Sequence, residues 1–107
     1  MDTLALKNTA IALENLLRRY GTTDPDARYL LLNLQPLISA AEQGQITTPV
    51  EARNIPGHRI MDEYNLRHYQ DLSDAYSNFY IELINGRESE VFKRLEESMR
   101  KTRQSNS

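Results

Sequence analysis

Two histidines and a group of carboxylates give the middle of this chain its widest choice of chemistry. His58 and His68 lie ten residues apart, with Asp62 and Glu63 between them. In principle such a set binds a divalent metal, but its spacing matches no known ligand motif. We therefore interpret both histidines as surface residues and expect neither a metal nor a cofactor.

Catalysis by paired carboxylates would draw on Asp62, Glu63, Asp71 or Asp74. Such a hydrolase needs a pocket that holds two acids at a controlled separation, and a small helical chain with two phenylalanines and no tryptophan offers little material for one. No motif places a serine beside a histidine, and the scattered glycines form no phosphate-binding loop. We expect a protein that is not an enzyme.

The same stretch is unevenly charged. From Asp62 to Glu82 there are five acidic residues and one basic residue, a local charge of −4, interleaved with tyrosines. We interpret it as a protein-binding face with its carboxylates on one solvent-facing side, because tyrosine gives a large contact area with a polar tip and carboxylates steer a basic partner. A solvated helix face whose tyrosines only pack is the open alternative. The candidate partner-binding residues are Arg59, Asp62, Glu63, Tyr64, Asp71 and Asp74.

Composition limits the class of protein. The 107 residues fit one domain, the net charge of −2 gives no global attraction to nucleic acid or to a membrane, and the lack of cysteine excludes disulfides. The N-terminus lacks a signal-like apolar segment, so we expect a cytoplasmic protein. Residues 91–107 carry five basic and two acidic residues, but no helix-turn-helix signature precedes them, and we interpret their charge as a solvated tail.

Apolar spacing predicts an all-α fold, a compact bundle of four main helices with an irregular connector. We expect helices over about 3–20, from 25 to Gly44, from 65 or 66 to 85, and from Ser89 onward. Residues 45–56 form the connector, with a short helical turn through Arg53, and residues 57–64 favour a loop over a turn of helix. The single domain covers 1–103, and 104–107 form a frayed tail.

Two of these helices have clear apolar stripes at steps of three and four. The first carries Leu6, Ala10, Leu13, Leu17 and Tyr20, with Ile11 and Leu16 broadening it. The third carries Leu66, Tyr69, Leu72, Tyr76, Tyr80 and Leu83. The second helix is rich in leucine and continues through Tyr29, Leu30, Leu31, Leu32, Leu34, Leu37 and Ile38.

The chain resembles the small helical immunity proteins that protect bacteria from type VI secretion effectors, of the kind paired with an NAD(P)⁺ glycohydrolase. The resemblance covers most of 4–86. It rests on the first helix through Arg19-Tyr20, the leucine-rich helix from Tyr29 to Ile38, Gly57 followed by Glu63-Tyr64, and Leu72-Ser73-Asp74-Ala75-Tyr76. This chain departs from the pattern at Pro36, in a shorter stretch between Tyr64 and Leu72, and in its basic extension after Gly86.

The resemblance implies an antitoxin that neutralises a cognate secreted toxin by occluding its active site. The toxin would use NAD⁺, as a glycohydrolase or an ADP-ribosyltransferase, and the two proteins would form a 1:1 heterodimer without nucleic acid or membrane. Asp62, Glu63 and Asp74 would meet basic groups of the toxin cleft, with Tyr64 adding contact area. The alternatives are a helical adaptor or chaperone for a secreted effector and a nucleic-acid-binding regulator.

Overall fold

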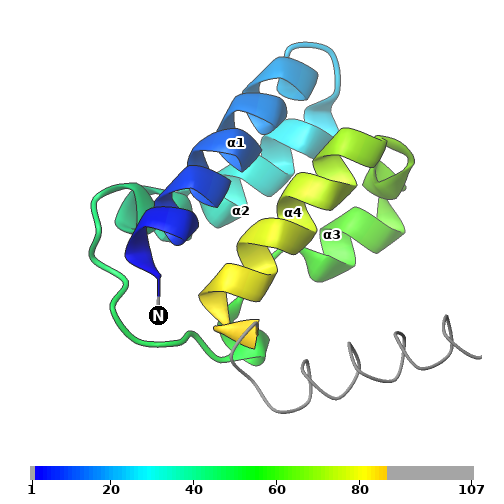
Figure 1. Cartoon of the computed structure of the whole chain (residues 1–107). Helices are drawn as coiled ribbons and strands as arrows, with labels where there is room; N and C mark the ends of the chain where they lie inside the picture. The colour runs from blue at the N-terminus through cyan, green and yellow to red at the C-terminus, as the bar shows by residue number, and fades with distance from the viewer. Residues whose placement is uncertain (1, 87–107) are drawn as a thin grey trace, which may run out of the picture.

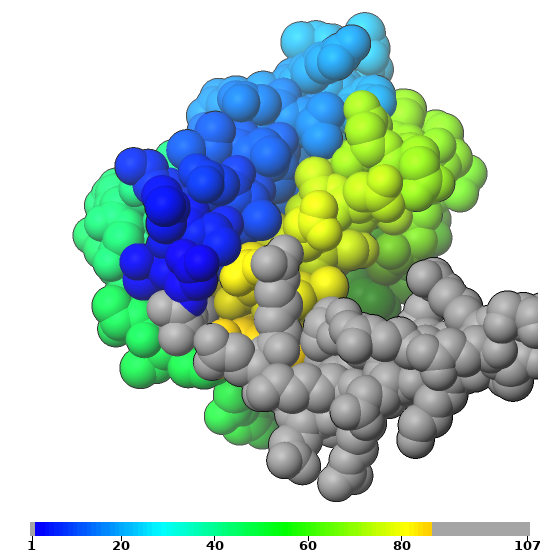
Figure 2. All heavy atoms as spheres, viewed as in Figure 1, coloured from blue at the N-terminus to red at the C-terminus, as the bar shows by residue number. Residues whose placement is uncertain are grey.

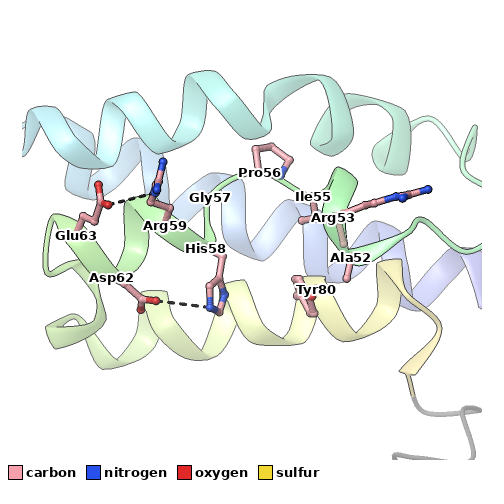
Figure 3. Close-up of a pocket in the computed structure, with 10 residues that line it drawn as sticks. All are labelled: Ala52, Arg53, Ile55, Pro56, Gly57, His58, Arg59, Asp62, Glu63 and Tyr80. Carbon is pink, nitrogen blue, oxygen red and sulfur yellow. Dashed lines mark ion pairs between the residues drawn. The ribbon is translucent and has the colours of Figure 1, made fainter.

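The computed structural model describes residues 2–86 as an all-α bundle, as the sequence predicts (Figure 1). Its elements are α1 (Thr3–Gly21), α2 (Pro25–Glu42), the 3₁₀ turn η1 (Ala52–Asn54), α3 (His58–Glu63), the 3₁₀ turn η2 (Leu66–His68) and α4 (Gln70–Leu83). Helix α1 packs against both α2 and α4, and α3 lies between α2 and α4 on the side away from α1 (Figures 1 and 3). The helix expected from Ser89 and the tail 104–107 lie outside the described residues.

Local signals determine where α1 and α2 begin. The Asp2 carboxylate accepts a hydrogen bond from the Ala5 amide at 2.9 Å, and the Asp24 carboxylate accepts one from the Asp26 amide, also at 2.9 Å. Pro25 follows Asp24 at the first helical position, where its missing N–H costs nothing. These caps satisfy amides that a helix start leaves without partners, so both helices begin close to the residues predicted.

The predicted stripes form the core, with two exceptions. The buried apolar side chains of the three long helices are Leu6, Ala10, Leu13, Leu17, Ala27, Leu30, Leu34, Ile38, Ala41, Leu72, Tyr76, Phe79 and Leu83. Phe79 was not in the predicted stripe of the third helix, although it continues the spacing of Leu72 and Tyr76. Ile11, expected to broaden the first stripe, is exposed, whereas Leu16 packs against the core.

The connector from α2 to α3 is irregular, as predicted, and contains the short turn η1. Its backbone is held to α4 where the Val50 amide donates to the Leu83 carbonyl at 2.8 Å. Ile55 is buried in the core cluster, and Val50 packs at its edge. The connector is therefore anchored at two points, which fixes the position from which α3 begins.

Residues 58–63 form a helix, so the prediction that 57–64 favours a loop was wrong. Gly57 precedes α3 with a φ of 108°, and its carbonyl accepts a hydrogen bond from the Met61 amide at 2.8 Å. Met61 is fully buried and Ile60 packs against the core. The burial of these side chains stabilises a helix of only six residues, because short helices depend on tertiary packing.

The helix predicted from residue 65 or 66 begins later, at Gln70. Asn65 has a φ of 56°, the left-handed conformation that asparagine tolerates better than most residues. A 3₁₀ turn follows and places Leu66 in the core. The three-residue steps from Leu66 to Leu72 imitate a helical period across this turn, which is why the sequence predicted a single helix.

Two tyrosines connect the start of α4 to the α1–α2 turn through ring stacking and hydrogen bonds. The rings of Tyr20 and Tyr69 stack with centroids 4.1 Å apart. The Tyr20 hydroxyl donates to Asp71 Oδ1 at 2.6 Å, and the Tyr69 hydroxyl donates to Asp24 Oδ2 at 2.9 Å. The first of these hydrogen bonds raises the pKa of Tyr20 and lowers the pKa of Asp71. This cluster holds the η2–α4 junction, and with it the far end of α3, in place.

Candidate functional site

Helix α3 brings four of the six candidate residues to one exposed surface. Arg59, Asp62 and Glu63 lie in the helix, Tyr64 caps its C-terminal end, and all four are exposed. We call these four residues, together with His58, the α3 face. Because α3 turns once every 3.6 residues, residues 58 and 62 share one side of it and residues 59 and 63 share the next.

Ion pairs connect the charged residues of the α3 face. Arg59 Nε lies 3.2 Å from Glu63 Oε1, and His58 Nε2 lies 3.5 Å from Asp62 Oδ2. In Figure 3 the Arg59–Glu63 pair extends toward α2, and the His58–Asp62 pair lies on the side of α4. Arg67 also donates to the Asp62 carboxylate, and this hydrogen bond lowers the pKa of Asp62. Asp62 therefore lies between two basic side chains.

The α3 face and its neighbours are balanced in charge. Arg53 beside this face pairs with Glu51 at 2.6 Å, so that three cations meet three carboxylates when the histidines are neutral. These residues are Arg53, Arg59 and Arg67 against Glu51, Asp62 and Glu63. The acidic excess counted along residues 62–82 does not appear on this surface, because only two of its five acids lie here and a guanidinium stands beside each of them.

Asp71 and Asp74 lie elsewhere. They line a groove of about 420 Å³ between α1 and α4, together with Asn8, Thr9, Ala12, Ala75 and Asn78. In Figure 2, α1 (blue) and α4 (yellow) meet along the side turned to the viewer, and this groove follows their junction. Asp74 accepts a hydrogen bond from Gln70 at 3.0 Å. The prediction that all four carboxylates share one side was wrong, because the turn at Asn65 gives α3 and α4 different directions.

A hollow of about 710 Å³ lies at the start of α3 (Figure 3). It is lined by Ala52, Arg53, Ile55, Pro56, Gly57, His58, Arg59, Asp62, Glu63 and Tyr80. Its backbone wall is the anchored connector, and its charged groups are the ion pairs described above. Such a surface offers shape and hydrogen-bonding groups to a partner, and Arg59 and Glu63 stand at its border with α2.

Beside this border lies an apolar edge that the sequence reasoning missed. Tyr29 and Leu32 of α2 are 49% and 73% exposed, and Tyr64 is 46% exposed. The rings of Tyr29 and Tyr64 meet edge to face, with centroids 6.3 Å apart. We call Tyr29, Leu32 and Tyr64 the α2–α3 edge. The sequence does contain a signal for their exposure: Leu30, Leu34 and Ile38 follow one another at four-residue steps and define the buried side of α2, and Tyr29 and Leu32 do not belong to this series.

Metal-binding groups and membrane-spanning helices were also sought within residues 2–86. Within this range no group of three or more side chains has the arrangement of a metal site. No helix in it combines the length and the apolar character needed to cross a membrane. Comparison of the chain with protein-family models, with curated proteins and with solved structures gives no match.

Proposed function

We propose that this chain is an immunity protein that neutralises a cognate secreted antibacterial toxin by occluding its active site. The toxin is an NAD⁺-using enzyme, a glycohydrolase or an ADP-ribosyltransferase. The antitoxin acts in the bacterial cytoplasm as one half of a 1:1 heterodimer and contributes surface without catalysis. The family resemblance of residues 4–86 supports this proposal, and the single structural observation that carries it is the exposed α2–α3 edge beside the α3 face.

The composition of this surface suits protein binding. Tyrosine and arginine are over-represented among the residues that dominate binding energy, and such residues lie near the centre of an interface with a polar rim around them. Here Tyr29, Leu32 and Tyr64 supply the apolar centre. The Arg59–Glu63 pair borders it. A stable complex buries roughly 800 Å² on each partner, so the α3 face and the hollow would belong to the contact area as well.

The surface is also held rigid before any partner arrives. Met61 anchors α3 in the core, and the Tyr20–Tyr69 stack holds the junction that follows it. A surface whose backbone is already in position loses less conformational entropy on binding. This favours an inhibitor that covers its target as a preformed block.

The test uses the toxin domain encoded by the gene immediately upstream. Its consumption of NAD⁺ is measured alone and with increasing amounts of the purified chain. We expect activity to be abolished at an equimolar ratio, and the complex to run as a 1:1 heterodimer in size-exclusion chromatography. The chain alone, at the same concentrations, is the control for NAD⁺ turnover of its own.

Each other result contradicts the proposal in a different way. A stable complex in which the enzyme keeps its full activity would identify an adaptor or chaperone instead. NAD⁺ turnover by the chain alone would make it an enzyme. The lack of any complex, combined with retention on DNA that salt strongly weakens, would favour the nucleic-acid-binding regulator.

A further inference from the structure

We infer that the toxin docks on the α2–α3 edge with an apolar segment, flanked by one acidic and one basic side chain that engage Arg59 and Glu63. This inference rests on the proposed function and specifies the partner's chemistry. From the sequence we expected carboxylates to enter a basic cleft of the toxin. The contact inferred here is instead apolar at its centre and balanced in charge at its border, so the rate of association should depend little on salt.

The apolar part follows from where exposed hydrophobic residues gather. Residues 2–86 expose five large hydrophobic side chains, and three of them form the α2–α3 edge. The other two, Leu4 and Ile11, lie on α1. Exposed hydrophobics that are scattered singly are normal, whereas interaction sites are marked by exposed hydrophobic residues that form a contiguous patch. Tyr29 and Tyr64 touch, and Leu32 lies three residues after Tyr29 on α2, where side chains are neighbours on the helix surface, so one apolar segment can reach all three.

The flanking charges follow from the Arg59–Glu63 pair. Its side chains are 86% and 58% exposed, and an exposed pair one helical turn apart is weak. Both groups can therefore turn to charges of a partner at little cost. Asp62 differs, because Arg67 and His58 already hold its carboxylate from two sides. Of the two carboxylates on the α3 face, Glu63 is the one available to a partner's cation, and Arg59 is then free for a partner's carboxylate.

The shape of the occupant follows from the hollow next to the edge. Arg59 and Glu63 line this hollow of about 710 Å³ (Figure 3), and Glu63 directly precedes Tyr64 of the α2–α3 edge. One partner surface that covers both needs a projection for the hollow and an apolar contact for the edge. The opening of an enzyme cleft bordered by loops has this form, since loops carry binding and catalytic residues around a rigid scaffold.

The charge balance leads to a kinetic expectation. Electrostatic steering of a partner speeds association by 10-fold or more and weakens steeply as salt increases. Three cations paired with three carboxylates on the contact surface, in a chain whose net charge is only −2, give a weak field beyond the screening length of about 10 Å at 0.1 M salt. We expect the association rate with the upstream toxin domain to change by less than about 3-fold between 50 and 500 mM NaCl.

A matched pair of leucine variants tests the docking position. Leu32→Ala and Leu4→Ala each truncate a largely exposed leucine, 73% and 65% exposed, on different helices. We expect Leu32→Ala to weaken binding of the upstream toxin domain at least 10-fold and Leu4→Ala to change it less than 2-fold. The double variant Arg59→Glu with Glu63→Arg keeps an ion pair on α3 but reverses its direction, and we expect it to weaken binding at least 10-fold. Circular dichroism melts check that every variant folds.

The outcomes separate this inference from the proposed function. Equal effects of Leu32→Ala and Leu4→Ala, with inhibition by the wild-type chain intact, overturn the docking position alone. A fall of 10-fold or more in association rate with salt overturns the charge-balanced contact. If the free chain forms a dimer that Leu32→Ala dissociates, the edge is an interface between copies and the partner assignment is wrong. Failure of the wild-type chain to bind the toxin overturns the proposed function, and this inference with it.

Discussion

Gly57, which directly precedes α3, has a backbone conformation and close neighbours that only glycine accommodates without strain. Replacing this residue tests how the start of α3 is held in position. The φ of 108° at Gly57 is unfavourable for any residue with a Cβ atom. An added Cβ would lie 2.7 Å from Leu30 Cδ1 and 3.1 Å from the Tyr76 ring. Both neighbours are buried core residues. Gly57→Ala therefore combines backbone strain with overpacking at the position where the connector enters α3.

The two costs can be estimated separately. A left-handed backbone costs an L-residue about 1–2 kcal/mol, and overpacking a well-filled core costs about 1–3 kcal/mol. The expected loss of unfolding free energy for Gly57→Ala is thus about 2–5 kcal/mol, a large share of the roughly 5–15 kcal/mol typical of a small domain. With a urea slope of about 1.5 kcal/mol per molar, a loss of about 3 kcal/mol lowers the midpoint by about 2 M.

Gly44→Ala is the matched control. Gly44 has a φ of 70°, and a Cβ there would meet nothing within 4 Å. Only the backbone cost applies, so we expect a loss of about 1 kcal/mol and a midpoint shift of about 0.7 M in the same urea titration. The difference between the two variants isolates the contact with Leu30 and Tyr76. Equal midpoints for the two variants would refute the close packing under α3 that this reasoning assumes.

Three further perturbations test the core and its titrating groups. Leu34→Ala, at a fully buried site, should cost about 2–5 kcal/mol of unfolding free energy, and the half-buried Leu37→Ala only about 1 kcal/mol; equal urea midpoints would contradict this order. Burial and nearby Glu14 raise the pKa of Glu42 above 4.5, so the folded state favours its neutral form. Glu42→Gln should raise Tm at pH 7, with a gain that vanishes below about pH 4.5; an equal gain at both pH values would exclude this cause. Burial also raises the pKa of Tyr76 from 10.0 to about 12. The stability that comes from burying the neutral phenol is therefore complete below pH 10 and is lost between pH 10 and 12. Tyr76→Phe should make the fall in Tm between these pH values less steep.

The helices that sequence predicted well carry their own boundary signals. Asp24 before Pro25 marks a helix start, and Asp2 can cap another. The stripe of Leu6, Leu13 and Leu17 repeats often enough to identify a buried face. These signals act within a few residues, so the bounds of α1 and α2 can be predicted from the sequence, although their packing against each other and α4 stabilises them.

The region from Gly57 to Tyr69 was harder because its structure depends on distant contacts. Helix α3 is six residues long and has one fully buried residue, Met61, which is too little for a periodic pattern. The left-handed Asn65 is stabilised once Leu66 is buried and Tyr69 stacks on Tyr20. Tyr20 is far away in sequence, so no local pattern could reveal the break before α4.

In the candidate site, too, the features set by neighbouring residues in the sequence were predicted and those set by distant contacts were not. Asp62 and Glu63 were predicted to face solvent, and Arg59 and Tyr64 were candidate residues of the same binding face; the structure exposes all four on or next to α3. The apolar edge was missed because Tyr29 and Leu32 belong to a leucine-rich run in which almost every position looks buried. The position of Tyr64 beside Tyr29 follows only from the way α3 crosses between α2 and α4.

The charge pattern decides how an inhibitor of this form would act. A cleft that binds the NAD⁺ pyrophosphate offers cations or helix N-termini, and a mimic of that ligand needs carboxylates without cationic partners. On the α3 face, Asp62 is held by His58 and Arg67, and Glu63 stands beside Arg59, whose positive charge would enter a cationic cleft with it. Asp71 and Asp74 lie in the separate groove between α1 and α4. Under the proposed function, a chain that docks through the α2–α3 edge would cover the opening of the toxin's cleft, and we expect that high NAD⁺ concentrations would not reduce its inhibition by competition for the same cations.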